Sequence, residues 1–183
     1  MKLVKWLILL LFSANVLADT EAAWQAWQKG EALLVMRHAL APGIGDPANF
    51  QLADCSTQRN LNSQGQQQAV VWGQRLRQRT TAPISIYSSQ WCRCLDTASY
   101  MAVGEVKPLP ILNSFFAGRG SRQQQTTALI SYFASSTVMQ PTVLVTHQVN
   151  FTELTGIFPQ SAEAAIIALP LSQPAKVLAR VAL

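Results

Sequence analysis

The chain has 183 residues, which is enough for one domain with a full hydrophobic core and too few for two domains of ordinary size. Apolar residues make up 49% of the chain and charged residues 13%, a balance that places it among globular proteins. The formal net charge is +5, but Lys and Arg form no block of the kind that binds nucleic acid. We therefore look for a single site and expect no nucleic-acid partner.

Residues 1–18 have the pattern of a secretory signal peptide. Two lysines precede an apolar run over residues 6–12, and the segment ends in small or apolar residues suited to signal-peptidase cleavage. The run is shorter than the roughly 20 residues that a membrane-spanning helix needs. We therefore expect cleavage before Asp19, a mature domain of residues 19–183 without a membrane span, and a periplasmic or secreted location.

Three cysteines lie in the expected mature domain, at positions 55, 92 and 94. Outside the cytoplasm an oxidised pair can persist. Cys92 and Cys94 would point apart on a helix, so a bridge from Cys55 to one of them is favoured, and the sequence does not decide which. Neither His has zinc-ligand spacing from these cysteines, so we expect no metal site and no other cofactor.

Short apolar runs alternate with longer amphipathic stretches, which is typical of βαβ units with a largely parallel sheet. The six expected strands are Ala32–Arg37, Ile84–Tyr87, Val106–Leu112, Thr142–Thr146, Ala164–Leu169 and Lys176–Leu183. The three expected helices are Gln64–Arg79 (with Ser63 as N-cap), Cys94–Val103 and Arg122–Ser135. The last two strands are close enough to pair antiparallel. The pattern predicts a three-layer α/β/α sandwich with a mostly parallel central sheet and an antiparallel edge strand.

Cationic and titratable side chains follow three of the expected strands. Arg37 and His38 end the first strand, and His147 ends the fourth. Arg93 lies in the first turn of the helix after the second strand, where free N–H groups and the helix dipole favour an anion. Because loops at strand ends converge on ligands in open α/β sheets, these four residues predict one cationic pocket.

These motifs, in this order, resemble the histidine phosphatase superfamily, also called phosphoglycerate-mutase-like, over nearly the whole mature chain. The residues that match the family's strand-end Arg-His-Gly signature, its Ser-rich strand end with Arg and Thr-Ala, and its second His are Arg37-His38-Ala39, Ser88, Ser89, Arg93, Thr97, Ala98 and His147. Ala39 stands where the family has Gly.

The resemblance implies a metal-independent phosphatase in which neutral His38 attacks phosphorus and becomes a phosphohistidine that water hydrolyses. Arg37 and Arg93 would hold the phosphoryl oxygens, and His147, if protonated, would add a third cationic donor. The expected substrate is a phosphomonoester or another activated phosphate on a small molecule or a glycan. Exported members of the family include one that acts on a lipopolysaccharide sugar phosphate.

The general acid that should protonate the leaving oxygen is not evident. The two positions where branches of the family carry this carboxylate hold Gln148 and Ser114. Glu153 and Asp54 are possible acids, and Asp46 is a further one. An alkoxide leaves poorly without a proton, whereas a good leaving group needs less help.

Two other functions stay open on the sequence. The missing acid favours a catalytically weak domain that binds phosphate groups or phosphorylated glycans. A mutase is the third possibility, although no segment obviously clamps a substrate in two orientations.

Overall fold

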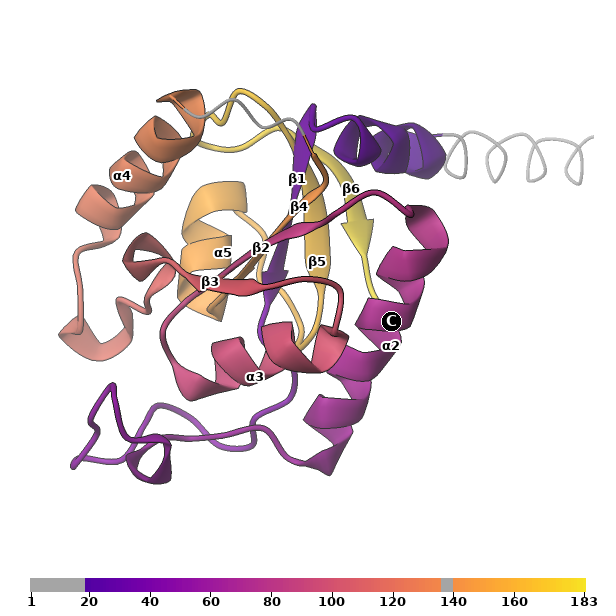
Figure 1. The fold of residues 1–183 in the computed structure, drawn as a ribbon. Coiled ribbons are helices and arrows are strands. Elements are labelled where there is room, and N and C mark those ends of the chain that lie inside the picture. Colours follow the sequence, from indigo (N-terminus) through magenta and orange to yellow (C-terminus); the bar gives the residue numbers. More distant parts are fainter. Residues whose placement is uncertain (1–18, 136–139) are drawn as a thin grey trace, which may run out of the picture.

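The computed structural model describes residues 19–135 and 140–183, so the predicted signal peptide lies outside the described residues. A six-stranded sheet forms the middle of the molecule (Figure 1). Its strands are β1 (Ala32–Arg37), β2 (Ser85–Ser88), β3 (Val106–Pro108), β4 (Thr142–Thr146), β5 (Ala164–Ala168) and β6 (Val177–Val181).

The strand order in the sheet is β3-β2-β4-β1-β5-β6. The first four strands of this order pair parallel, whereas β5 runs antiparallel to both β1 and β6. The mostly parallel α/β fold and the antiparallel pairing of the last two strands are therefore confirmed. Strand β4 lies between β2 and β1, which places the ends of these three parallel strands side by side.

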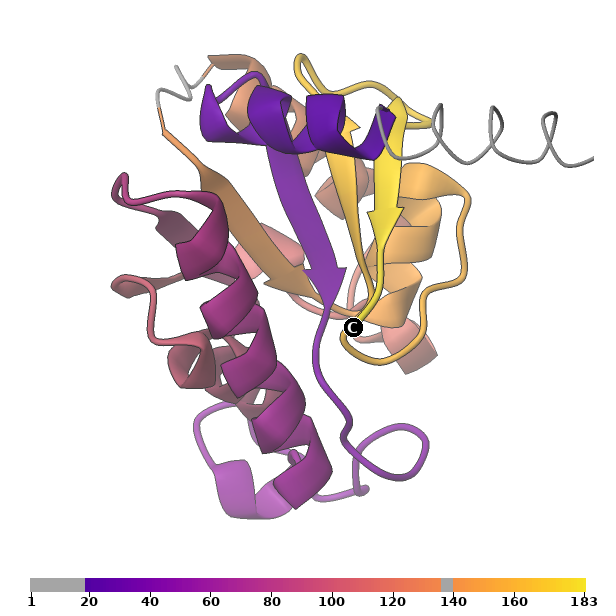
Figure 2. The same cartoon turned by 90° about the vertical axis from the view of Figure 1, so that its right-hand side faces the viewer.

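Helices cover both faces of the sheet (Figures 1 and 2). The sheet is flanked by α2 (Ser63–Arg79), α3 (Cys92–Met101), α4 (Arg122–Ser135), α5 (Gln148–Thr155) and a helix over residues 19–28. Short 3-10 turns are η1 (Cys55–Thr57), η2 (Pro110–Leu112) and η3 (Phe116–Gly118). The helix at 19–28, α2 and α3 pack on one face, and α4 and α5 pack on the other.

The two cores follow the alternation of side chains along each strand. In β1, Leu34 and Met36 join the core under α2 and α3, whereas Leu33 and Val35 join the core under α4 and α5. All four side chains are at most 1% exposed. This double burial explains why β1 reads as a continuous apolar run.

Several predicted boundaries are corrected by the structure. Helix α2 is capped by Asn62, whose Oδ1 accepts from Gly65 N at 2.8 Å, and Ser63 is already helical. Strand β3 ends at Pro108, because the chain turns into η2, which begins with a proline. Helix α3 begins two residues before the predicted start, and β6 is shorter at both ends.

Residues 19–28 form a helix that the sequence analysis did not predict. Trp24 and Trp27, three residues apart, are fully buried against the sheet, and Trp27 Nε1 donates to Thr142 O at 2.9 Å. None of the helices in the described ranges is long and apolar enough to cross a membrane.

A disulfide joins Cys55 in η1 to Cys92, the first residue of α3, with a Cα–Cα distance of 5.7 Å. The open choice of partner is thereby settled for Cys92. Cys94 is a free, buried thiol. The bridge ties the long β1–α2 connection, residues 39–62, to the start of α3.

Candidate active site

The candidate site lies at the carboxyl ends of β2, β4 and β1. His38 N donates to Thr146 O, and Ser89 N donates to Val145 O, each at 2.9 Å. These bonds continue the strand pairing one residue past the strands themselves, so His38, His147 and the Ser89 backbone lie next to one another. The position of the site therefore follows directly from the strand order.

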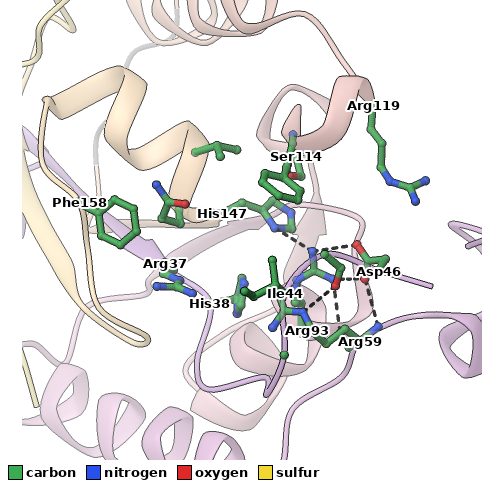
Figure 3. Close-up of a pocket in the computed structure, with 15 residues that line it drawn as sticks. Arg37, His38, Ile44, Asp46, Arg59, Arg93, Ser114, Arg119, His147 and Phe158 are labelled. Carbon is green, nitrogen blue, oxygen red and sulfur yellow. Dashed lines mark hydrogen bonds and ion pairs between the residues drawn. The ribbon is translucent and has the colours of Figure 1, made fainter. Parts of the chain in front are cut away.

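A cavity of about 270 Å³ opens at this edge (Figure 3). Its lining residues come from the end of β1, the connections after β1, β3, β4 and α5, and the first turns of α3 and α5. They include Arg37, His38, Ile44, Asp46, Arg59, Arg93, Ser114, Phe116, Arg119, His147, Gln148, Val149 and Phe158. The structure thus brings together the four residues predicted from strand ends. The cavity walls carry four arginines and, among the residues described, one carboxylate.

His38 is held in a form suited to nucleophilic attack. Its side chain is buried, at 2% exposure, and its Nδ1 lies 2.7 Å from the carbonyl oxygen of Ala39. A carbonyl can only accept, so Nδ1 carries the proton and Nε2 keeps its lone pair. Burial, followed by the charge of Arg93, lowers the pKa of His38 well below its ordinary value of 6.5. His38 is therefore neutral at neutral pH.

His147 lies beside His38, with 5.6 Å between the ring centroids. Its Nε2 is 2.8 Å from Ser89 Oγ, which in turn donates to Asn113 Oδ1, and its Nδ1 is 3.5 Å from an Arg93 nitrogen. Burial, then His38 and Arg93, lower the pKa of His147 well below 6.5. The third cation expected from the sequence is therefore an uncharged imidazole at neutral pH in this structure.

Arg93 forms a buried two-pronged ion pair with Asp46 (Figure 3). Its Nη1 and Nη2 lie 2.7 and 3.2 Å from the two carboxylate oxygens, and the two side chains are 4% and 5% exposed. Trp91 Nε1 and Arg59 N also donate to this carboxylate, each at 3.1 Å. Burial alone would raise the pKa of Asp46, but the bonds from Arg93, Arg59 and Trp91 outweigh it and lower the pKa.

Two buried nitrogens of the arginines that line this cavity have no hydrogen-bond partner in the described part of the chain. They are Arg37 Nε and Arg93 Nε, both buried. Arg37 is held from the other side, because its Nη1 donates to Pro159 O at 3.0 Å. A buried, unpaired guanidinium N–H is costly, and an oxyanion bound in a cavity that both arginines line would bring acceptors close to their guanidinium groups.

The sequence profile of the histidine phosphatase superfamily, branch 1, matches residues 33–128. The chain belongs to the histidine phosphatase superfamily. No curated protein sequence matches the chain with comparable significance.

Solved structures of this superfamily share the fold. The protein histidine phosphatase SixA in complex with tungstate aligns with a TM-score of 0.59 at 15% identity, covering 82% of this chain and 96% of SixA. A SixA-type protein from Agrobacterium tumefaciens gives 0.57 at 17% identity, covering 84% and 99%. A mycobacterial glucosyl-3-phosphoglycerate phosphatase gives 0.52 at 18% identity, covering 75% and 89%.

Of the three candidate acids named from the sequence, Asp46 lines the cavity and Asp54 and Glu153 do not. Asp54 accepts from Ser56 N at 2.9 Å at the exposed start of η1. Glu153, on α5, accepts from Gln173 at 2.8 Å and lies 3.5 Å from Arg122. Neither Asp54 nor Glu153 is among the residues that line the cavity, so the structure does not bring these two candidate acids to the predicted site.

Two further arginines of the pocket were missed in the sequence. Arg59 lies in the loop after β1, and burial, then the charge of Arg93, lower its pKa to about 10. Arg59 also holds that loop, because its Nε donates to Gly45 O at 2.9 Å. Arg119 is exposed at the cavity mouth. Neither arginine follows a strand, so no periodic signal marked them.

Thr97 and Cys94 of α3 support the site from behind. Thr97 Oγ1 accepts from Ala39 N at 3.0 Å and donates to Arg93 O at 2.6 Å, which links the residue after His38 to Arg93. Cys94 Sγ lies 3.5 Å from His147 Nε2, and burial raises the pKa of this thiol to about 12. A protonated thiol is a poor nucleophile, so His38 is the better-prepared attacking group.

Proposed function

We propose that this protein is a metal-independent phosphatase in which His38 forms a phosphohistidine intermediate. The observation that carries the proposal is the state of the pocket floor: a neutral His38 with a free Nε2 lies beside two arginines whose buried Nε–H groups have no protein partner. A phosphoryl group supplies the oxygens that these donors lack and the phosphorus that His38 can attack.

The proposed first step is an in-line displacement at phosphorus. His38 Nε2 donates its lone pair to phosphorus as the bond to the ester oxygen breaks, and Arg37 and Arg93 bind the equatorial oxygens. Burial and the neighbouring cations lower the pKa of His147, and a bound dianion would raise it, so that His147 can donate a hydrogen bond to the transferring group. Water then attacks the phosphohistidine and restores His38.

Asp46 is the proposed source of the leaving-group proton. It is the carboxylate that lines the cavity in the described part of the chain, and its partner Arg93 is the group that a phosphoryl oxygen would engage. When a substrate takes up donors of Arg93, the bonds that lower the pKa of Asp46 weaken and the nearby negative charge increases. Both changes favour a protonated Asp46 beside the ester oxygen.

The first test is His38→Asn, assayed with acetyl phosphate and 4-nitrophenyl phosphate. We expect kcat to fall by at least about a thousandfold because the covalent step is lost. Gln148→Ala, which changes another cavity residue with no assigned chemistry, is the control and should stay within about tenfold. Turnover by His38→Asn at the wild-type rate would contradict the mechanism.

The Arg93–Asp46 pair also supports a second function, a domain that binds phosphate groups without turning them over. Both terminal nitrogens of Arg93 are engaged by Asp46, so a ligand must compete with an internal carboxylate. Calorimetry with inorganic phosphate separates the two functions. Binding without turnover of any phosphate compound would favour the binding domain.

Export and substrate are part of the proposal. The signal-peptide pattern of residues 1–18 supports a periplasmic or secreted enzyme, and the mass of the protein recovered from the periplasm would test cleavage before Asp19.

The phosphohistidine and sugar-phosphate phosphatases among the structural neighbours support a small-molecule or glycan phosphate as substrate.

A further inference from the structure

Exposed apolar side chains gather at the mouth of the cavity. Seven large apolar or aromatic side chains are exposed in the described part of the chain, and three of them line this one cavity. Ile44 is 93% exposed, Phe158 63% and Phe116 44%. Single exposed apolar residues are ordinary, but three around one opening mark a contact surface.

The three residues, which we call the apolar rim, come from three separate loops. Ile44 belongs to the loop after β1, Phe116 begins η3, and Phe158 follows α5. The Phe116 ring lies against the loop that carries Ile44, because its Cε1 would be 3.7 Å from a Cβ atom placed on Gly45. Phe158 precedes Pro159, whose carbonyl binds Arg37. The rim is thus connected to the residues of the cavity floor.

The polar floor and the apolar rim face different parts of a ligand. His38 and His147 at the floor are 2% and 3% exposed, so a phosphorus atom in contact with His38 lies deep in the cavity. The organic group of a bound phosphomonoester must then extend through the mouth of the cavity, where Ile44 and Phe158 lie (Figure 3). The rim therefore contacts the leaving group and not the phosphoryl oxygens.

Charge and apolar surface together define the chemistry of the occupant. Four arginines and one aspartate line the cavity, so the end of the ligand that enters it is anionic. Covering three apolar side chains at the mouth is most favourable when the adjoining part of the ligand is apolar as well, because no polar group then loses its water. A fully hydroxylated sugar ring next to the phosphate would leave this rim poorly matched.

We propose that the apolar rim binds an apolar group on the alcohol part of the substrate, so that the preferred substrate is an amphipathic phosphomonoester with a hydrocarbon portion next to its phosphate. This inference rests on the proposed phosphatase function and narrows its substrate class. The rim distinguishes substrates by their leaving group, whereas Arg37, Arg93 and the two histidines bind the part that all phosphomonoesters share.

The test is a series of n-alkyl phosphates from ethyl to hexyl, below their aggregation limits. Their alcohols have nearly the same acidity, so differences in kcat/KM report contacts of the alkyl chain and not leaving-group chemistry. We expect kcat/KM to rise about two- to fourfold per methylene until the rim is covered. Equal values for ethyl and hexyl phosphate, or a higher value for glucose 6-phosphate than for hexyl phosphate, would overturn the proposal.

Substitutions in the rim connect the effect to these side chains. In the Ile44→Ser/Phe158→Ser variant and in Phe116→Ser, the hexyl-to-ethyl ratio of kcat/KM should fall toward one. Tyr100→Ser is the matched control, because Tyr100 is 43% exposed on α3 and does not line the cavity. It should keep the wild-type ratio. A ratio that persists in the rim variants would contradict the assignment.

Two further measurements separate this proposal from its alternatives. Hexyl- and ethylphosphonate resist hydrolysis, so their inhibition or binding constants give the same comparison even where turnover of alkyl esters is slow. Stronger binding of the hexyl compound would support the proposal that the apolar rim binds the alkyl group, and equal binding of the two compounds would overturn it. A rise that appears only with phosphate esters embedded in vesicles would instead indicate docking on a lipid surface. Failure to turn over acetyl phosphate would count against the phosphatase function and not against the rim.

Discussion

The residue after His38 sets the tautomer in which its Nε2 can attack phosphorus. Ala39 replaces the Gly of the family signature, yet it is fully buried and its backbone is free of the left-handed conformation that requires Gly. Its carbonyl fixes the proton of His38 on Nδ1, and its N–H is bound by Thr97. Residue 39 acts on the site through its backbone C=O and N–H groups, so Ala can replace Gly at this position.

Asp46→Asn tests the proposed proton donor. The ratio of turnover for ethyl phosphate to that for acetyl phosphate should fall by about a hundredfold or more, because only the poor leaving group depends on a proton. If Asp46 acted only by positioning Arg93, the substitution would lower the turnover of ethyl phosphate and of acetyl phosphate by the same factor. An unchanged ratio would therefore contradict the role of Asp46 as the acid.

Arg59 was not found from the sequence, and Asp46 was named there only as one of three candidate acids. The strand-end residues Arg37, His38 and His147 were visible because each follows an apolar run that predicts a buried strand. Asp46 and Arg59 instead lie in a long connection without periodicity, and their positions depend on bonds to α3 and to each other. Such tertiary contacts leave no local pattern.

The strands of the sheet were predicted well because buried strands are visible in the sequence as apolar runs. Strands with buried residues on both faces need continuous apolar segments, and those segments are readable in one sequence. The helix over residues 19–28 was missed, although Trp24 and Trp27 have helical spacing, because so short a segment offers few apolar repeats. The strand order and the Cys92 pairing required the structure itself.

The disulfide between η1 and α3 gives a prediction for this loop. It closes a segment with a sequence separation of 37, for which the loss of chain entropy in the unfolded state corresponds to about 3–4 kcal/mol. The Cys55→Ala/Cys92→Ala variant should lose about this much unfolding free energy in urea titrations. Its kcat/KM should also fall, because the bridge holds the connection that carries Asp46 and Arg59.

The control for the disulfide is Cys94→Ala. Cys94 is buried like Cys92 but forms no disulfide, so its loss should cost only about 1 kcal/mol. If the double variant were no less stable than Cys94→Ala, the bridge would not stabilise the folded chain.

Across the whole molecule, the buried histidines make stability depend on pH. The pKa values of His38 and His147 are lowered by burial, so between 6.5 and those lower values the unfolded chain binds protons that the folded chain does not. The unfolding free energy should therefore fall below pH 6.5, by up to about 1.4 kcal/mol per pH unit for each His. The pKa of Asp46 is also lowered, so protonation of this carboxylate should reduce the unfolding free energy further below about pH 4.

Urea titrations between pH 8 and 5 would measure this dependence. The chain contains two His, so His38→Asn should remove about half of the slope between pH 6.5 and 5. A flat unfolding free energy over this interval would mean that the two histidines titrate alike in the folded and unfolded chains.

The central claim is a covalent phosphoryl group on His38. Brief reaction with ³²P-labelled acetyl phosphate, followed by alkaline quenching and peptide mass spectrometry, would locate the label directly. We predict one acid-labile, base-stable adduct on Nε2 of His38 and no label in His38→Asn. A label on another residue, or turnover without any phosphohistidine in single-turnover experiments, would contradict the account.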